Sequence, residues 1–323
     1  KIQHLIWPLG RHTSMDKLFA LLQCSSSSAA EAVAFDVPGG KAYRIRIVRA
    51  LSDNYMYLIV NTSEKTAVAV DPVDAGRIIT ACEEMGAQLV AVLTTHYHAD
   101  HSGGNEELRQ RFPGLHVLVG AGDHPRTPGV TGGVSNGEVV QFAGLQFQCI
   151  DTPCHTRGHV AFFLDARDGQ SPALFSGDAL FVAGCGRFLE GTAMEMRNSL
   201  AALATLPGAT RVFCGHEYTV TNLKFAASLE PENVLVSSRL RDAEVKRTAG
   251  VPTVPSTIAE ELEHNPFLRI HEPSIAAAVA CDPNDALNVM ARLRRSKDTF
   301  TTVGKLMTWS LDLTGMLGLR STM

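Results

Sequence analysis

Residues 94–105 have the sequence TTHYHADHSGGN, which places His96, His98, Asp100 and His101 within six residues. They follow the almost wholly apolar run QLVAVLTT (88–95), which predicts a strand buried on both faces. In α/β sheets, the loops at the carboxyl ends of strands carry functional groups. His96 and His98 lie two residues apart, so in an extended segment both imidazoles project to the same side. The stretch therefore predicts a metal site at a strand end.

Four potential ligands in six residues are more than one ion accommodates easily. A single ion takes three or four such ligands at about 2.0 to 2.2 Å, so division between two ions is sterically easier. Further candidates each follow an apolar strand and accompany Gly or Pro: His155 in DTPCHTRGH, Asp178 in FSGDALF and His216 in VFCGHEY. Together these five histidines and two aspartates predict a site for two ions.

The remaining histidines carry no such pattern. A single histidine near a strand end is more often an ordinary polar residue than a metal ligand, and we interpret four of them in this way: His116, His124, His264 and His271. His159 lies nearer to the predicted ligands, and we expect it to have a structural role beside them.

The order of elements predicts two parts. Strand patterns begin at Tyr43, Tyr55, Thr66, Gln88, His116, His159 and Ala173, one strand is expected from Gly137 to Ile150, and RVFCG (211–215) is the last. Helices are expected at 74–85 and 192–206, and helical patterns alone follow Tyr218, at 222–229, 231–249 and 285–295. We therefore expect an N-terminal extension (1–40), an α/β catalytic domain (41–218), a helical substrate-binding domain (219–300) and a C-terminal tail (301–323).

Composition excludes several classes of protein. The chain has 323 residues, of which 45% are hydrophobic and 19% charged, as in soluble globular proteins. No run of about 18 apolar residues predicts a membrane-spanning helix, and a net charge of −4 argues against nucleic acid as a partner. The seven cysteines form no Cys-x-x-Cys pair, which favours a reducing compartment over a disulfide framework.

The first 40 residues differ from the rest. They contain the low-complexity run LLQCSSSSAAEA (21–32) and, before Glu31, a single acid, Asp16. This composition is typical both of an organellar transit peptide and of a disordered extension. The expected location is therefore the cytoplasm, or a mitochondrion or plastid if this segment acts as a transit peptide.

The motifs together resemble a known family. THYHADH is similar to the T-H-x-H-x-D-H motif of the metallo-β-lactamase fold, an α/β fold in which two mixed sheets form an αββα sandwich. The set THYHADHSGGN, TPCHTRGH, FSGDALFVAGCGRFLEGT, GHEYTVTNLKFA and NPFLR resembles glyoxalase II, the hydroxyacylglutathione hydrolase family. The similarity runs from about Tyr43 to Phe300, and the later motifs narrow it from the superfamily to this family.

The resemblance implies a role for each candidate ligand. His96, His98 and His155 would hold one divalent ion, Asp100, His101 and His216 a second, and Asp178 would bridge both. Asp100 and Asp178 would thus serve catalysis as ligands. The ions would be zinc, with iron or manganese as alternatives. A hydroxide shared by the two ions would attack the thioester of S-D-lactoylglutathione, giving D-lactate and glutathione, the second step of methylglyoxal detoxification.

The resemblance also implies residues that bind glutathione. Arg294 and Lys297, three apart on one helical face, match the family's pair for the glycine carboxylate, and Arg187 and Tyr218 match further contacts. Leu189 departs from the family, which often has Tyr there, so one hydrogen bond to the substrate is expected to be missing. The extension before residue 40 and the tail after residue 300 match nothing in the family.

Two alternatives remain open from the sequence. One is another enzyme of the same fold, such as a persulfide dioxygenase with a single iron. The other is a non-catalytic binding protein that has inherited the fold, although the presence of all seven ligands argues against it. In each case the expected partner is a small molecule rather than a nucleic acid or a membrane, and a monomer is expected.

Overall fold

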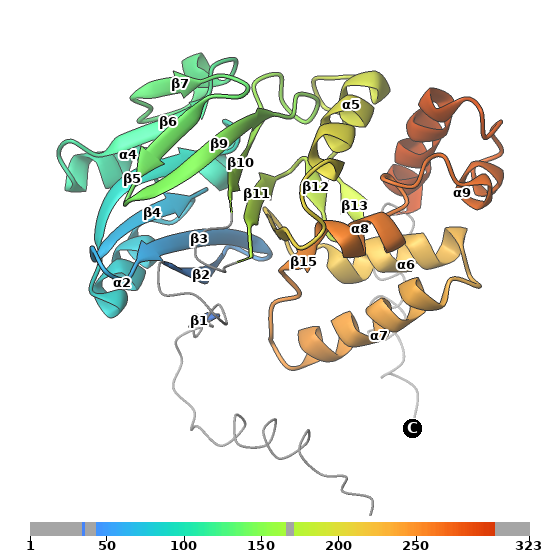
Figure 1. The fold of residues 1–323 in the computed structure, drawn as a ribbon, viewed down its shortest axis with the longest axis horizontal. Coiled ribbons are helices and arrows are strands. Elements are labelled where there is room, and N and C mark those ends of the chain that lie inside the picture. The colour runs from blue at the N-terminus through green and yellow to red at the C-terminus, as the bar shows by residue number, and fades with distance from the viewer. Residues whose placement is uncertain (1–33, 36–42, 166–170, 301–323) are drawn as a thin grey trace, which may run out of the picture. The chain divides into compact units, whose positions relative to one another are not determined.

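The computed structural model describes residues 34–35, 43–165 and 171–300. They form the expected αββα sandwich, in which two β-sheets face each other between outer layers of helices (Figure 1). The extension before residue 34 and the tail after residue 300 lie outside the described residues. The transit-peptide interpretation therefore stays a prediction.

The first sheet begins as an antiparallel meander and continues as parallel strands. Its order is β1-β2-β3-β4-β5-β6-β7, antiparallel up to β4 and parallel beyond it. The strands are β1 (Ala34–Phe35), β2 (Tyr43–Ala50), β3 (Asn54–Asn61), β4 (Thr66–Val70), β5 (Gln88–Thr94), β6 (His116–Gly120) and β7 (Gly132–Val134).

The second sheet has the order β15-β14-β11-β10-β9-β8. Its strands are β8 (Val139–Phe142), β9 (Leu145–Asp151), β10 (Val160–Leu164), β11 (Ala173–Gly177), β14 (Arg211–Cys214) and β15 (Ser256–Thr257). β11 and β14 are parallel, so their carboxyl ends lie at the same edge. A short hairpin, β12 (Leu180–Phe181) with β13 (Gly184–Cys185), follows β11 directly.

Helices cover the outer face of each sheet (Figure 1). On the first sheet lie α2 (Ala75–Met85) and α4 (Asn105–Arg111), and the single turn α3 (Ala99–Ser102) precedes α4. The second sheet is covered by α5 (Ala193–Ala204) and α8 (Ile258–His264). α9 (Pro273–Ala278) and a helix over 286–300 pack beyond them in the same apolar cluster. Beyond the hairpin, α6 (Thr219–Leu229) packs on α7 (Val234–Thr248). A 3-10 turn, η1 (His124–Arg126), lies between β6 and β7.

Apolar side chains that point alternately to the two faces of β3 explain why the sheets stack. Tyr57 and Ile59 point into the cluster between the sheets, whereas Met56 and Leu58 point into the cluster beneath α2. From the opposite sheet, Phe175 meets Tyr57 with ring centroids 5.5 Å apart. Because successive side chains of a strand point to opposite faces, a strand that is apolar at every position must be covered on both.

The structure corrects the sequence prediction in three places. The single strand expected from Gly137 to Ile150 is two strands, because Ala143 and Gly144 both have positive φ and form a two-residue hairpin turn of the primed type. β15 pairs with β14 although strand signals stop before it in the sequence, since it is only two residues long. β7 is rich in glycine and was not expected from its sequence.

The described part of the chain bears on two further expectations, which concern membrane-spanning helices and disulfide bonds. Within it, no helix combines the length and apolar character needed to cross a bilayer. Its six cysteines, Cys82, Cys149, Cys154, Cys185, Cys214 and Cys281, are free thiols.

Replacing Phe162 by Ala should destabilise the sandwich. Phe162 is fully buried between the sheets, so the cavity should lower the free energy of unfolding by about 3 to 5 kcal/mol. Urea denaturation of the metal-free protein would measure this. Val139→Ala, at a strand position that is 57% exposed, is the control and should change the value by less than about 0.5 kcal/mol. Equal unfolding midpoints for the two variants would contradict this packing.

Candidate metal centre

The predicted ligands gather where strands of both sheets end. His96 follows β5, His155 follows β9, Asp178 follows β11 and His216 follows β14. The two sheets are joined at this edge by a backbone hydrogen bond of 2.8 Å from Tyr55 N–H to the Gly215 carbonyl. Residues far apart in the sequence therefore share one small volume.

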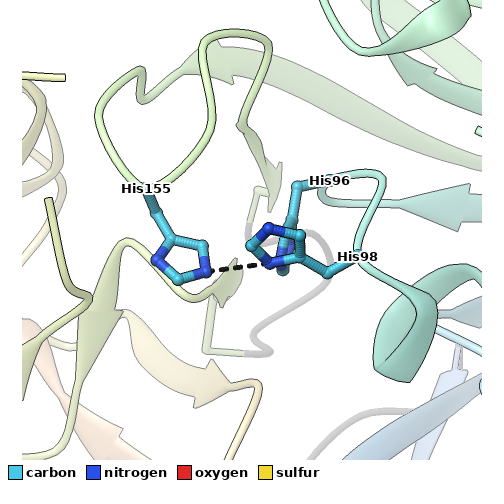
Figure 2. Close-up of side chains that lie close together, drawn as sticks. All are labelled: His96, His98 and His155. Carbon is cyan, nitrogen blue, oxygen red and sulfur yellow. Dashed lines mark hydrogen bonds between the residues drawn. The ribbon is translucent and has the colours of Figure 1, made fainter. Parts of the chain in front are cut away.

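His96, His98 and His155 form the first group of candidate ligands. Their rings point toward one another from two loops (Figure 2). His98 Nδ1 lies 2.9 Å from His96 Nε2 and 3.1 Å from His155 Nε2. Three imidazole nitrogens this close can hold one metal ion.

Asp100, His101 and His216 form the second group. His216 Nε2 lies 3.2 Å from His101 Nε2 and 3.4 Å from Asp100 Oδ2. The amide of Asn54 donates to Asp100 Oδ2 over 3.1 Å and so orients the carboxylate. This group differs from the first because it contains a carboxylate of its own.

Asp178 lies between the two groups. Its Oδ2 is 3.4 Å from His155 Nε2 in the first group, and its Oδ1 is 3.4 Å from His101 Nε2 in the second. The side chain is buried, and Oδ1 accepts no hydrogen bond from any described residue. A buried carboxylate oxygen without a hydrogen bond is costly unless a cation approaches it, so the residues present fit divalent metal binding.

The nitrogens that point away from the centre are held by acceptors. His101 Nδ1 donates to Asp71 over 3.0 Å, and His216 Nδ1 donates to Asp53 over 2.9 Å. His155 Nδ1 donates to the Arg187 carbonyl over 3.1 Å. Each bond holds a proton on the outer nitrogen, so the inner nitrogen is the one that faces a metal.

Asp53 and Asp71 are not predicted from the sequence. Their partners His216 and His101 are 163 and 30 residues away, so no local pattern marks them. The available signal was that Asp71 directly follows an apolar strand and that Asp53 lies in the turn before another.

His159 has the structural role expected of it. Asp178 N–H donates to its Nε2 over 3.1 Å, so its Nδ1 carries the proton and donates to Thr152 over 2.7 Å. Its ring stacks on His96, with centroids 5.0 Å apart. His116, His124 and His271 are exposed, and buried His264 lies beside Glu261.

The charges of the centre suit a cation. Burial opposes ionisation of Asp178, but His101 and His216 hold the pKa of its carboxyl below the usual range. A hydrogen bond from His216 lowers the pKa of Asp100. Burial and the neighbouring imidazoles hold the pKa of His96 well below normal, so its ring stays neutral. Despite burial, the neighbouring carboxylates, Asp178 first, raise the pKa values of His101 and His216, so these two rings must lose a proton to bind a metal. Ionised carboxylates and neutral imidazoles are the forms that bind metals.

The four residues expected to bind substrate lie in two settings. Tyr218 stacks on the His216 ring, with centroids 4.7 Å apart and planes 1° from parallel, and the Arg187 side chain is exposed. Arg294 and Lys297 are buried at 7% and 5% exposure. Arg294 donates to the Cys185 carbonyl, and Lys297 donates to the Thr221 carbonyl. The side chain of Leu189 is exposed.

Known proteins are similar in sequence to this chain over most of its length. The chain is 44% identical over 253 residues to the cytoplasmic hydroxyacylglutathione hydrolase of Arabidopsis thaliana, covering 78% of this chain and 96% of that protein. It belongs to the hydroxyacylglutathione hydrolase family. A second relative, the hydroxyacylglutathione hydrolase of Synechococcus sp. (strain JA-3-3Ab), is 46% identical over 257 residues, covering 80% and 100%. The family models for the metallo-beta-lactamase superfamily and for the hydroxyacylglutathione hydrolase C-terminus match residues 51–216 and 217–300.

Solved structures agree with this fold. ETHE1 from Myxococcus xanthus is 27% identical with a TM-score of 0.54, covering 77% of this chain and 89% of that one. A metallo-beta-lactamase from Staphylococcus aureus is 20% identical with a TM-score of 0.56, covering 79% and 72%, and shows the fold alone. The expected α/β sandwich with a helical C-terminal region is thereby confirmed.

Replacing Asp53 by Ala should weaken metal binding. The His216 imidazole would lose the carboxylate that orients it, and loss of such a partner lowers metal affinity about 10- to 100-fold. Competition with a chromophoric chelator would measure the dissociation constant. Asp53→Asn keeps an acceptor oxygen without the charge, so its dissociation constant should lie between those of the wild type and Asp53→Ala. Glu107→Ala on the exposed face of α4 is the control, and an effect of equal size there would contradict a specific role for Asp53.

Proposed function

We propose that this chain hydrolyses S-D-lactoylglutathione to D-lactate and glutathione. The observation that carries the proposal is the convergence of two ligand groups on one buried carboxylate, Asp178. Support comes from the relatives named hydroxyacylglutathione hydrolase and from the match of residues 217–300 to the C-terminus of that family.

In this proposal the ligand groups hold two divalent ions. His96, His98 and His155 would hold the first, Asp100, His101 and His216 would hold the second, and Asp178 would serve both. When bound, such ions would lower the pKa of a water molecule and polarise the substrate carbonyl. Nitrogen and oxygen donors suit zinc, iron and manganese, and we propose zinc.

The buried thiols of Cys154 and Cys185 are poor nucleophiles, which supports attack by water. Burial raises the pKa of the Cys154 and Cys185 thiols to about 12, so neither forms thiolate at neutral pH. The departing thiol of glutathione needs no strong acid, because a thiol with a pKa of about 8.5 is a good leaving group. The reaction thus requires no side-chain nucleophile.

The helical region supplies cations for the substrate. Arg294 and Lys297 lie on the helix over 286–300, and we propose that they attract a carboxylate of glutathione. Arg187 and Tyr218 would contact the peptide nearer to the metals. Asp298, which lies 3.6 Å from Arg187 and 2.7 Å from Arg294, links these cations.

A one-iron dioxygenase would need only one of the two ligand groups. The presence of the second group, with its own carboxylate Asp100, favours hydrolysis. The helical C-terminal match favours the same conclusion.

The partner in this proposal is a small glutathione thioester bound by a monomer. A cytoplasmic location follows the Arabidopsis relative, whose name states it. An organellar location would depend on the segment before residue 41, most of which lies outside the described residues.

Asp178→Asn should abolish turnover and metal retention together. The amide is neutral and presents only one acceptor oxygen, so it cannot contact both ions as a carboxylate does. Steady-state hydrolysis of S-D-lactoylglutathione, with metal analysis of the same sample, would measure both. Two tightly held ions in the variant would contradict the bridging role. Absence of glutathione release from the folded, metal-loaded wild type would contradict the proposed function.

Substrate affinity should fall as pH rises through neutrality. Burial lowers the pKa of Lys297 to about 7, so the ammonium that attracts a carboxylate is lost above that pH. If binding needs the charge, kcat/KM should fall about fivefold from pH 7 to pH 8, following the protonated fraction, mainly through KM. Lys297→Arg keeps its charge throughout and should remove this decline. A flat wild-type profile between pH 6 and 9 would contradict the role of Lys297.

A further inference from the structure

A group of four residues outside the ligand set connects the loops around the first ligand group. Tyr97, Asp123, Arg126 and Glu190, here called the Glu190 network, come from three separate segments. Tyr97 lies between His96 and His98, Asp123 and Arg126 lie at η1, and Glu190 lies between β13 and α5. None of these side chains belongs to either ligand group.

Glu190 accepts hydrogen bonds from three places at once. The Arg126 guanidinium donates to both of its oxygens, over 2.6 and 2.9 Å, and the Tyr97 hydroxyl donates over 3.0 Å. The backbone N–H of Arg157 donates over 2.8 Å, two residues beyond His155. In the opposite direction, the Glu190 N–H donates to the Cys154 carbonyl over 3.1 Å. Glu190 is thus bound on both sides of His155.

Asp123 makes a second set of connections from a fully buried position. It accepts from the Tyr97 N–H over 3.2 Å and from the Thr156 hydroxyl over 2.6 Å. The Gly158 N–H and Arg126 donate to its other oxygen, over 3.0 and 2.9 Å. All of its partners lie in the loops that carry His96, His98 and His155 or in η1. Such a saturated buried carboxylate holds the loops in one geometry.

Arg126 and Tyr97 connect the two carboxylates. The guanidinium carbon lies 3.8 Å from the centroid of the Tyr97 ring, a cation–π contact, while the same group bonds to Asp123 and Glu190. The Tyr97 ring in turn packs edge-on against the His98 ring, with centroids 4.7 Å apart. Arg126 therefore acts on His98 through Tyr97.

The two ligand groups differ in how their imidazoles are oriented. In the second group, the carboxylates of Asp71 and Asp53 accept directly from His101 and His216. In the first, His155 donates to a backbone carbonyl and His96 is paired with the Thr95 hydroxyl, 3.1 Å away, both neutral partners. Neutral acceptors orient a ring less strongly than carboxylates do, so placement of the first group depends more on its loops.

We propose that the Glu190 network positions the first ligand group, so that losing it weakens metal binding at His96, His98 and His155 but not at Asp100, His101 and His216. The inference rests on the proposed function, since it assumes that each group binds an ion. The four network residues are positioning residues, because they touch ligand side chains and loops rather than reacting atoms. Because Glu190 and Arg187 share one loop, the network also connects that loop to the first group.

The test measures each group alone. His216→Ala removes a ligand of the second group and leaves the first complete, and His98→Ala does the reverse. Metal-free protein of each kind is titrated with Co²⁺ against a competing chelator, with and without Glu190→Ala. In the His216→Ala background, Glu190→Ala should raise the Co²⁺ dissociation constant about 10- to 100-fold. In the His98→Ala background it should change the constant by no more than about twofold, the limit for independent sites.

Glu230→Ala is the matched control. Glu230 binds Arg269 through both oxygens, as Glu190 binds Arg126, but in the helical region between α6 and α9. It should leave Co²⁺ binding unchanged in both backgrounds. Glu190→Gln, which keeps an acceptor oxygen at the same length, should restore part of the affinity lost in Glu190→Ala.

Three results would overturn the inference while leaving the proposed metal site in place. Equal weakening of both groups by Glu190→Ala would indicate general loosening, and no weakening of the first group would indicate that its loops hold their shape unaided. If Glu230→Ala weakened Co²⁺ binding as much as Glu190→Ala, the effect would not be specific to the Glu190 network. Absence of Co²⁺ binding in the His216→Ala background with Glu190 intact would instead overturn the proposed metal site itself, and the inference with it.

Discussion

Burial of the Asp178 carboxylate among imidazoles is the constraint on which the rest of the structure depends. Removing a carboxylate from water costs several kcal/mol unless opposite charge or hydrogen bonds replace the lost hydration. Among the described residues, the imidazole nitrogens of His101, His155 and His216 lie within 3.5 Å of its oxygens, and partners behind these rings hold their orientations. The centre therefore has two shells of polar contacts. The imidazoles stabilise the buried Asp178 carboxylate, and the partners behind the imidazoles stabilise these buried rings in turn.

The sandwich and the centre cannot be separated physically. The Tyr55 N–H and the Tyr57 hydroxyl of the first sheet donate to the carbonyls of Gly215 and Cys214 beside His216 in the second. The same contacts close the edge of the fold and set the distance between the ligands that each sheet contributes. Close packing allows no side chain at Gly186, where an added Cβ would lie 1.9 Å from the Asp178 carbonyl oxygen.

The candidate ligands were predictable from sequence because each follows an apolar strand within a distinctive local motif, and the structure brings all seven together. The residues behind them were not predictable in this way. Asp53 and Glu190 act on partners 163 and 93 residues distant, and only the folded chain reveals such pairs. The single strand predicted from Gly137 to Ile150 was wrong for a local reason. Ala143 has a positive φ, which is uncommon for alanine and cannot be predicted from its side chain. The burial of Arg294 and Lys297 likewise depends on packing that a charged helix face in the sequence does not reveal.

The hydrogen bond from Arg294 to the Cys185 carbonyl limits how the helical region can be exchanged between related proteins during evolution. It joins the last described helix to the hairpin that follows Asp178, so the helical region is part of the frame of the centre. A recombinant chain that exchanged this region for a relative's would have to bring a matching arginine and hairpin together. The two parts are therefore expected to be inherited as one unit rather than shuffled as independent modules.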